Sequence, residues 1–302
     1  MNTIILSRSA HIYSTQRLAL VCRARGHQVR VIDPLRCSIV LRPAGGEVLL
    51  DGEPLQPVDA VIPRIGRSTS FYSLAVLRQF ESAGSFCLNG SRSVALARDK
   101  LNALQALAAA GLSMVPTAFA RHPRGVRQAV ADIGGLPCVV KVTDGSQGFG
   151  VMLAESGPAV ESIVEAFHNV RQNILLQQYV RSDGDLRLLV VGRRVVAAMR
   201  RRARDGDFRT NLHRGGFAEV HRATELECRI ALRATRAVGL DVAGVDLIEG
   251  PQGPLLLEVN ASPGLRGIES ASGRNVASAI VRLLESRLRA RRPQPAPAIG
   301  HP

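Results

Sequence analysis

The first ninety residues alternate between short apolar stretches and amphipathic ones, and this alternation restricts the possible folds more than any other feature. Residues 3–7 and 28–32 are predicted strands, and the spacing of Leu18 and Cys22 predicts a helix over 14–25 between them. The same alternation continues with a strand at 59–62, a helix near 71–83 and a short strand at 86–88. Such alternation is typical of a small parallel α/β unit. Two segments split by a Gly-Gly pair, 38–41 and 47–50, predict a hairpin inserted in it.

The remainder of the chain divides into two further units. A helix rich in Ala and Leu is predicted over 92–110. The second unit has strands near 117–120, 138–143, 151–154 and 174–179, with helices near 124–133 and 158–170. The third has strands at 186–191, 195–202, 243–248 and 254–260, a loop over 204–216, and helices at 224–238 and 275–289. We therefore predict domains at 1–95, 96–182 and 183–289, and a disordered proline-rich tail at 290–302.

The composition is that of a soluble globular protein with a large positive charge. The net charge is +14, and only Lys100 and Lys141 among 39 basic residues are lysines. A genome that favours arginine codons explains this bias, but attraction to an acidic or ribosome-associated partner is also open. Because the chain has no tryptophan and 4% aromatic residues, base-stacking surfaces are scarce, and we expect no sequence-specific nucleic-acid binding.

The sequence also indicates a cellular compartment. No apolar run reaches the roughly 18 residues that a membrane span needs, and the start has no signal-peptide pattern. The five cysteines are far apart and show neither metal nor redox spacing. We expect a cytoplasmic protein with reduced cysteines and no membrane contact.

A set of oxygen ligands provides the sharpest chemical signal. Glu258 and Asn260 lie two apart on a predicted strand and so face the same side. A turn centred near residue 252 places Asp246 across from Glu258. Two carboxylates this close repel each other unless a cation lies between them. Oxygen-only ligands suit Mg²⁺, so Asp246, Glu258 and Asn260 are predicted metal ligands, against the alternative of scattered acids on an exposed hairpin.

A glycine-rich loop follows the predicted strand at 138–143. Its residues Gly145, Ser146, Gln147 and Gly148 could bring backbone N–H groups close to phosphates. The loop lacks the Gly-Lys-Ser/Thr of a Walker sequence, and a plain glycine hairpin is an equal alternative. Lys141 on the entering strand favours the phosphate site, because a buried lysine needs an anionic partner.

Two weaker signals lie on either side of residue 183. The apolar strand that ends in Gln178 and Tyr179 could read adenine with its backbone, and Asp185 could accept a bond from ribose, although an ordinary edge strand is the simpler explanation. In the run Arg200-Arg201-Arg202, strand alternation places Arg201 on one side and its two neighbours on the other. At least one of them should point toward the metal site.

Taken together, these residues resemble the RimK-type ligases of the ATP-grasp superfamily over about 1–288. The stretches that carry the resemblance are 61–66 (VIPRIG), 97–100 (ARDK), 145–150 (GSQGFG), 206–216 (GDFRTNLHRGG) and 258–264 (EVNASPG). The resemblance implies an ATP-grasp fold, of mixed α/β and α+β class, with an N-terminal Rossmann-like pre-ATP-grasp domain. It also implies that two lobes clasp ATP between their sheets.

The resemblance assigns roles to individual residues. Lys100 and Lys141 would hold the phosphates, Gln178 and Tyr179 would frame adenine, and Asp185 the ribose. Gln178 departs from the Glu usual there, which matters little if backbone groups read the base. The nucleotide and acyl-phosphate region would be lined by Arg209, Thr210 and Asn211. Two Mg²⁺ ions, or Mn²⁺ in their place, would be held by Asp246, Glu258 and Asn260. We choose Arg202 as the arginine that stabilises the phosphoryl group, because Arg200 on its face is basic where the family more often has an acid.

The resemblance further implies an activity and partners. A carboxylate would attack the γ-phosphate of ATP, and the amine of L-glutamate would then attack the acyl phosphate. The implied acceptor is the C-terminal carboxylate of a small-subunit ribosomal protein, and the implied assembly is a homo-oligomer, perhaps a tetramer. The alternatives are the same chemistry on a small molecule or cofactor, free polyglutamate synthesis, and a non-catalytic ATP-binding regulator, which should lack some metal ligands.

Overall fold

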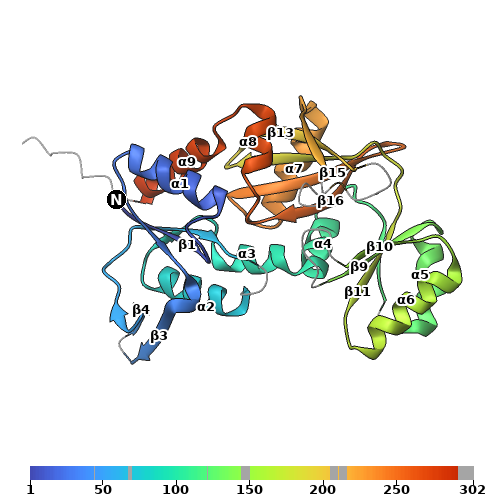
Figure 1. The fold of residues 1–302 in the computed structure, drawn as a ribbon, viewed down its shortest axis with the longest axis horizontal. Coiled ribbons are helices and arrows are strands. Elements are labelled where there is room, and N and C mark those ends of the chain that lie inside the picture. Colours follow the sequence, from blue (N-terminus) through green and yellow to red (C-terminus); the bar gives the residue numbers. More distant parts are fainter. Residues whose placement is uncertain are drawn as a thin grey trace, which may run out of the picture.

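The computed structural model of the 302-residue chain describes 1–43, 45–66, 70–120, 122–143, 150–204, 210 and 216–291. The described residues form an elongated molecule in which the N-terminal α/β unit and a small lobe lie at opposite ends, with a larger sheet between them (Figure 1). None of the helices in the described part is long and apolar enough to span a membrane.

The N-terminal unit is a parallel sheet, as the alternating pattern predicts. Its strands run in the order β2-β1-β6-β7, and every neighbouring pair is parallel. The elements are β1 (Asn2–Ser7), α1 (Tyr13–Ala24), β2 (Gln28–Ile32), β6 (Ala60–Arg64), α2 (Ser70–Ser82) and β7 (Phe86–Cys87). The predicted hairpin is present as β3 (Cys37–Arg42) and β4 (Gly45–Leu50), preceded by a short 3-10 turn, η1 (Pro34–Arg36), and joined by β5 (Glu53–Pro54).

The single helix predicted over 92–110 is wrong, because it is two helices. α3 (Ser91–Arg98) and α4 (Lys100–Ala109) are separated by Asp99, whose backbone is extended (φ −77°, ψ 102°). The Asp99 carboxylate accepts a bond from the Asn102 N–H (3.0 Å) and so caps α4. The break makes Lys100 the first residue of the second helix.

The small lobe is an antiparallel sheet in the order β10-β9-β11-β8 with two helices on it. The predicted strands are confirmed within one residue at each end. The elements are β8 (Thr117–Ala120), η3 (Pro123–Gly125), α5 (Val126–Asp132), β9 (Cys138–Val142), β10 (Val151–Ala154), α6 (Gly157–Asn169) and β11 (Ile174–Gln178).

The large sheet has five antiparallel strands in the order β14-β13-β12-β15-β16. Its elements are β12 (Asp185–Val191), β13 (Arg194–Arg202), β14 (Phe217–Val220), α7 (Glu225–Ala237), β15 (Val242–Gly250), β16 (Gly253–Asn260), α8 (Arg266–Ser272) and α9 (Val276–Arg291). Sequence reasoning missed the short elements β14 and α8. The predicted tail starts too early, since α9 continues through Arg291, and 292–302 lie outside the described residues.

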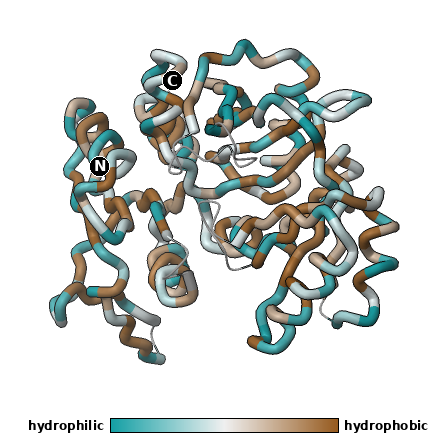
Figure 2. The backbone as a smooth tube through the Cα atoms, turned by 45° about the vertical axis from the view of Figure 1, so that its right-hand side comes forward, coloured by the Kyte–Doolittle hydropathy of each residue, from teal (hydrophilic) through white to brown (hydrophobic). Residues whose placement is uncertain are grey.

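The hydrophobic cores show which parts of the molecule are packed together. Two cores each combine residues of the N-terminal unit with residues of the large sheet; Leu6 and Leu188 share one, and Ile5 and Leu189 the other. The small lobe has a separate core around Val140, and apolar stretches run along the backbone throughout the molecule (Figure 2). The cysteines are free and mostly buried, which agrees with the predicted core role.

Hydrogen bonds of Asn89 also join the N-terminal unit to the large sheet, in addition to the shared cores. Its buried side chain donates to the carbonyls of Val242 (2.7 Å) and Ala261 (3.0 Å) and accepts from the N–H groups of Asp241 (2.7 Å) and Val242 (2.8 Å). The bonded residues lie at the start of β15 and directly after β16, so Asn89 fixes the ends of the two strands that carry the predicted metal ligands.

Candidate active site

Asp246 and Glu258 lie directly opposite each other on β15 and β16, as the turn geometry predicts. The register shifts immediately beyond them, since Leu247 pairs with Leu256, and this leaves Leu257 as the extra residue of a β-bulge. Asn260 donates from Nδ2 to Glu258 Oε1 (3.0 Å), so the two side chains share a face. The predicted juxtaposition of the three residues is confirmed.

Two arginines that the sequence reasoning did not assign surround Asp246. Arg187 of β12 lies opposite Asp246 in register and holds both its oxygens, with Nε–Oδ1 at 2.7 Å and Nη2–Oδ2 at 2.6 Å. Arg201 of β13 lies opposite Asp185, holds both its oxygens at 2.6 Å, and also reaches Asp246 Oδ2 at 2.9 Å. These four side chains form a continuous ion-pair network on one face of the sheet.

Burial gives this network its energetic weight. Asp246 is 2% exposed, Arg201 4% and Asp185 8%. Burial by itself would raise the pKa of Asp246, but the charges of Arg187 and Arg201 hold it below its usual range. Burial by itself would lower the pKa of Arg201. The nearby charges of Asp246 and Asp185 outweigh this effect and raise the pKa. Asp246 and Arg201 are therefore both charged at neutral pH.

Arg202, the arginine chosen from the sequence, has other partners than Asp185 and Asp246 among the described residues. Its Nε donates to Glu219 (3.0 Å) and its Nη1 to the Asp183 carbonyl (3.3 Å). Arg200 pairs with Glu249 at 2.9 and 3.1 Å. The alternation itself is right, but the side of β13 that faces the site is the side of Arg201.

The donor set fits a hard cation. Asp246, Glu258 and Asn260 present only oxygen atoms as possible ligands, which is the preference of Mg²⁺. Oδ2 of Asp246 accepts two bonds and Oδ1 accepts one, so Oδ1 retains a lone pair. Within the described part of the chain, no three His, Cys, Asp or Glu side chains form a metal cluster. A metal at this site would therefore complete its shell with oxygens from elsewhere, such as phosphate and water.

Lys141 is positioned by a chain of hydrogen bonds whose direction is fixed. The Thr117 hydroxyl donates to the Val115 carbonyl (2.8 Å), so it accepts from Gln177 Nε2 (2.9 Å). The opposite end of the Gln177 amide, Oε1, then accepts from Lys141 Nζ (2.5 Å). Gln177 is buried, at 4% exposed. The lysine is thus held by a neutral oxygen rather than by a carboxylate.

Charges on the large sheet also act on Lys141. Burial lowers the pKa of its amine, against the pull of Glu258, Asp185 and Asp246. These three residues belong to the large sheet, so carboxylates of one lobe act on a lysine of the other.

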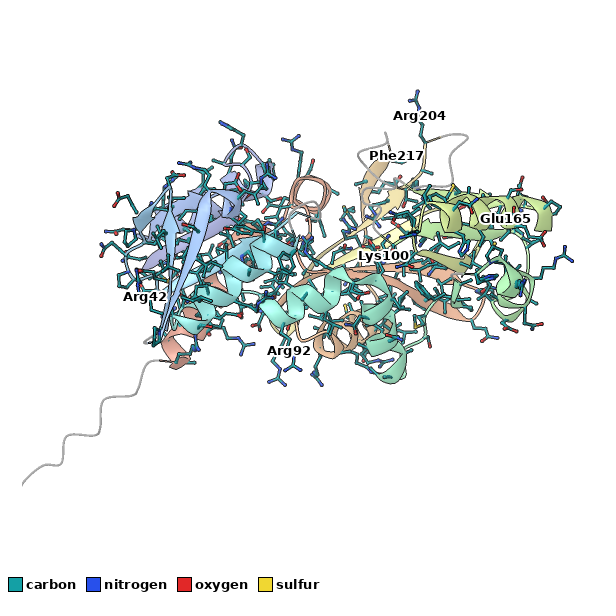
Figure 3. All side chains as sticks on the ribbon, turned by 90° about the horizontal axis from the view of Figure 1, so that it is seen from below. Arg42, Arg92, Lys100, Glu165, Arg204 and Phe217 are labelled. Carbon is teal, nitrogen blue, oxygen red and sulfur yellow. The ribbon has the colours of Figure 1, made fainter. Side chains whose placement is uncertain are left out.

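Lys100 reaches the same strand from α4. Its Nζ donates to the carbonyl of Val142 (3.1 Å), the residue after Lys141, and Figure 3 shows Lys100 in the middle of the molecule. Both lysines of the chain therefore lie beside β9, where the glycine-rich loop begins. The loop residues Gly145, Ser146, Gln147 and Gly148 lie outside the described residues.

The proposed nucleotide-reading residues are only partly described. Gln178 ends β11, and its N–H bonds to the Pro116 carbonyl (2.9 Å); Tyr179 follows it. Asp185, expected on ribose, is instead engaged by Arg201, and Thr210 donates to its Oδ2 (2.7 Å). A ribose contact by Asp185 would have to share the carboxylate with these donors. Arg209 and Asn211 lie outside the described residues.

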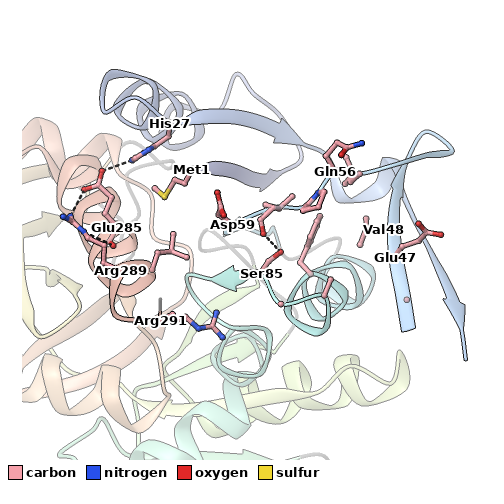
Figure 4. Close-up of a pocket in the computed structure, with 18 of the residues that line it drawn as sticks. Met1, His27, Glu47, Val48, Gln56, Asp59, Ser85, Glu285, Arg289 and Arg291 are labelled. Atoms are coloured by element: carbon pink, nitrogen blue, oxygen red, sulfur yellow. Dashed lines mark hydrogen bonds and ion pairs between the residues drawn. The ribbon is translucent and has the colours of Figure 1, made fainter. Parts of the chain in front are cut away.

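A separate cavity of about 1000 Å³ lies far from these residues in the fold. It is lined by the residues that begin the parallel strands and by α9, among them Met1, Asp59, Ser85 and Glu285 (Figure 4). Glu285 is already paired there with Arg25 and His27, both at 2.7 Å. The turn that follows β16 lies at the opposite, carboxyl ends of those strands, where Arg64 of β6 contacts Pro263.

Comparison with known proteins identifies the family. Residues 97–284 match the RimK-like ATP-grasp domain, and residues 1–94 match the RimK PreATP-grasp domain. The chain belongs to the RimK-like ATP-grasp family. This ATP-grasp ligase is 49% identical over 296 residues to a probable alpha-L-glutamate ligase of Thioalkalivibrio sulfidiphilus, covering 97% of this chain and 98% of that one. It is 47% identical over 290 residues to a protein of the same name from Vibrio cholerae, covering 95% and 96%.

Solved structures share the fold of this RimK-like protein. The ATP-grasp ligase PsnB in complex with its minimal precursor superimposes with a TM-score of 0.76 at 23% identity, covering 94% of this chain and 99% of PsnB. The D-cycloserine synthetase DcsG gives a TM-score of 0.73 at 22% identity, covering 95% and 100%. The predicted ATP-grasp fold with an N-terminal pre-ATP-grasp domain is confirmed.

Proposed function

We propose that the protein is a Mg-ATP-dependent ligase that adds L-glutamate to the C-terminal carboxylate of a small-subunit ribosomal protein. The observation that supports the chemistry is that the candidate site combines cationic lysines with a set of oxygen ligands. Lys141, and Lys100 beside it, are cations suited to phosphate, while Asp246, Glu258 and Asn260 form an oxygen donor set. Mg²⁺, as one or two ions, or Mn²⁺, would neutralise phosphate charge there.

The chain's own residues would act by positioning and charge rather than as nucleophiles. Lys141, held by Gln177, would attract the phosphates of ATP. The acceptor carboxylate would take the γ-phosphate and release ADP, and the glutamate amine would displace phosphate from the acyl carbon and lose a proton. Arg201 is bonded to Asp246, whereas Arg202 is bonded to Glu219, so we favour Arg201 for charge at the phosphoryl group. Arg202, Arg209 and Asn211 stay predictions.

The names of relatives at 47–49% identity support glutamate as the incoming amino acid. The related ligase PsnB binds a precursor peptide, which is compatible with a protein acceptor. The net charge of +14 would suit a product that gains a negative charge with each glutamate. A cytoplasmic homo-oligomer, such as a tetramer, is part of the same proposal.

The test is intact-mass spectrometry of the host's small ribosomal subunit proteins with the gene present or deleted. We expect one protein to carry a ladder spaced by single glutamates, lost on deletion and restored by wild type but not by Glu258→Gln. Glu249→Gln is the matched control, because Glu249 lies on the same hairpin but pairs with Arg200. Unchanged masses, with ADP release intact on small acceptors or on glutamate alone, would contradict the ribosomal acceptor and leave the ligase with a small-molecule substrate or with free polyglutamate synthesis.

A further inference from the structure

Arg64 is a half-buried cation with no acidic partner among the described residues. It ends β6, and its Nη2 donates to two main-chain carbonyls, those of Pro263 (2.7 Å) and Ser262 (3.4 Å). Burial lowers the pKa of Arg64 to about 10, and no carboxylate of a described residue acts against that effect. The side chain is still charged at neutral pH, so the fold holds a positive charge that no carboxylate of a described residue neutralises.

Among the described residues, most donors of the Arg64 guanidinium have no acceptor. Arginine has five N–H donors, and both hydrogen bonds to described residues use a single nitrogen, Nη2. The Ser262 hydroxyl oxygen is buried and has no hydrogen-bond partner among the described residues. Arg64 thus brings a planar fork against the turn after β16 that carries the Ser262 hydroxyl, and a fork with a hydroxyl is a donor set that matches a carboxylate.

The position is next to the proposed reacting centre. Pro263 packs near Gly244, since a Cβ added to that glycine would lie 2.8 Å from the Pro263 side chain. Gly244 pairs with Asn260 in the sheet. Pro263 is three residues from Asn260, which limits their Cα separation to about 10 Å. An amino acid bound at the metal ligands could therefore touch Arg64.

We propose that Arg64, together with the Ser262 hydroxyl, binds a carboxylate of the incoming amino acid. This inference rests on the proposed ligase function. The acceptor carboxylate becomes an acyl phosphate and belongs near Lys141 and the metal ligands. The carboxylates of the amino acid keep their charge throughout the reaction and require a permanent cation, which Arg64 supplies.

The experiment measures ADP release against amino-acid concentration for wild type, Arg64→Met, Arg64→Lys and Ser262→Ala, with Arg78→Met, an exposed arginine of α2, as the control. Arg64→Met should raise the KM for the amino acid about 10- to 100-fold and leave the KM for ATP unchanged. Arg64→Lys should give a smaller rise, because the charge remains and the fork is lost. The smallest rise is expected for Ser262→Ala, and these two conservative variants decide the matter if Arg64→Met does not fold.

Amide analogues separate binding from a structural role. Wild type should prefer the amino acid over its α-amide or, for glutamate, over its γ-amide, and Arg64→Met should lose one of these preferences. Retention of both preferences, or KM values for ATP and amino acid that rise together with a fall in melting temperature, would overturn the proposal. The assay is run with all twenty amino acids. If glutamate is inactive and another is active, the glutamate assignment fails and Arg64 is tested with that amino acid; if none is active, both fail.

Discussion

The site contains two groups of charged side chains that are held in opposite ways. On the large sheet, Asp185, Arg201, Asp246 and Arg187 neutralise one another through bonds of 2.6–2.9 Å. Elsewhere in the site, Lys141 and Arg64 are held by neutral oxygens, an amide and two carbonyls. The first group therefore fixes geometry, while the second would keep its charge available for anions.

The largest effect should come from removing the centre of the neutralised group. Arg201→Met leaves Asp185 without its bidentate partner and Asp246 with one arginine, so it should destabilise the protein by about 3–5 kcal/mol. The measurement is the midpoint of urea unfolding at neutral pH. Its neighbour Arg202, paired with Glu219 on the exposed side, is the control and should cost about 1 kcal/mol or less when changed to Met. Equal shifts for the two variants would show that the network has no special weight.

A second substitution would turn a cation held by a neutral oxygen into one paired with a carboxylate. Gln177→Glu gives Lys141 a carboxylate partner, so the lysine charge should be neutralised and Mg-ATP affinity should fall about tenfold, or about 1.4 kcal/mol. Isothermal titration calorimetry measures this directly. Gln177→Met removes the anchor but leaves the charge, and it should weaken binding less. If Met weakens binding as much as Glu, then orientation rather than charge is what Gln177 provides.

The smallest effect is expected at a neutralised cluster remote from the site. Hydrogen bonds from Arg25 and, to a smaller extent, from His27 lower the pKa of Glu285 to about 2. Because this folded-state pKa lies below the unfolded value of about 4.3, the stabilisation is complete above pH 4.3 and disappears as the pH falls to 2. Thermal melts of wild type and Glu285→Gln should differ by about 1 kcal/mol or less at pH 7 and converge toward pH 2. A difference that persists at pH 2 would assign the effect to packing of α9 instead.

Much of the fold could be predicted because it follows from local patterns. Strand and helix periodicity located the parallel sheet and the two antiparallel ones, and the symmetry of a turn placed Asp246 opposite Glu258. The break at Asp99 was missed because Ala and Leu on both sides favour helix, and the cap that interrupts it is one side-chain bond. β14 and α8 are too short for periodicity to reveal.

The parts of the site that escaped prediction depend on contacts between distant residues. Alternation along β13 separates Arg201 from Arg202, but which face meets the carboxylates is decided by how the sheet packs. A signal for Arg187 was present, since it lies two residues after Asp185 on one strand face. The contact of Arg64 with Pro263 spans 199 residues, and no local pattern encodes it.

The separate core of the small lobe has a consequence for cooperativity. The N-terminal unit and the large sheet share two cores and the Asn89 bonds, so they should gain and lose structure as one unit, whereas the lobe around Val140 has its own. Lys141 belongs to the lobe and the carboxylates to the larger unit. A nucleotide bound by both would bridge two bodies with separate cores. Part of its binding energy would then stabilise one arrangement of the two bodies relative to each other.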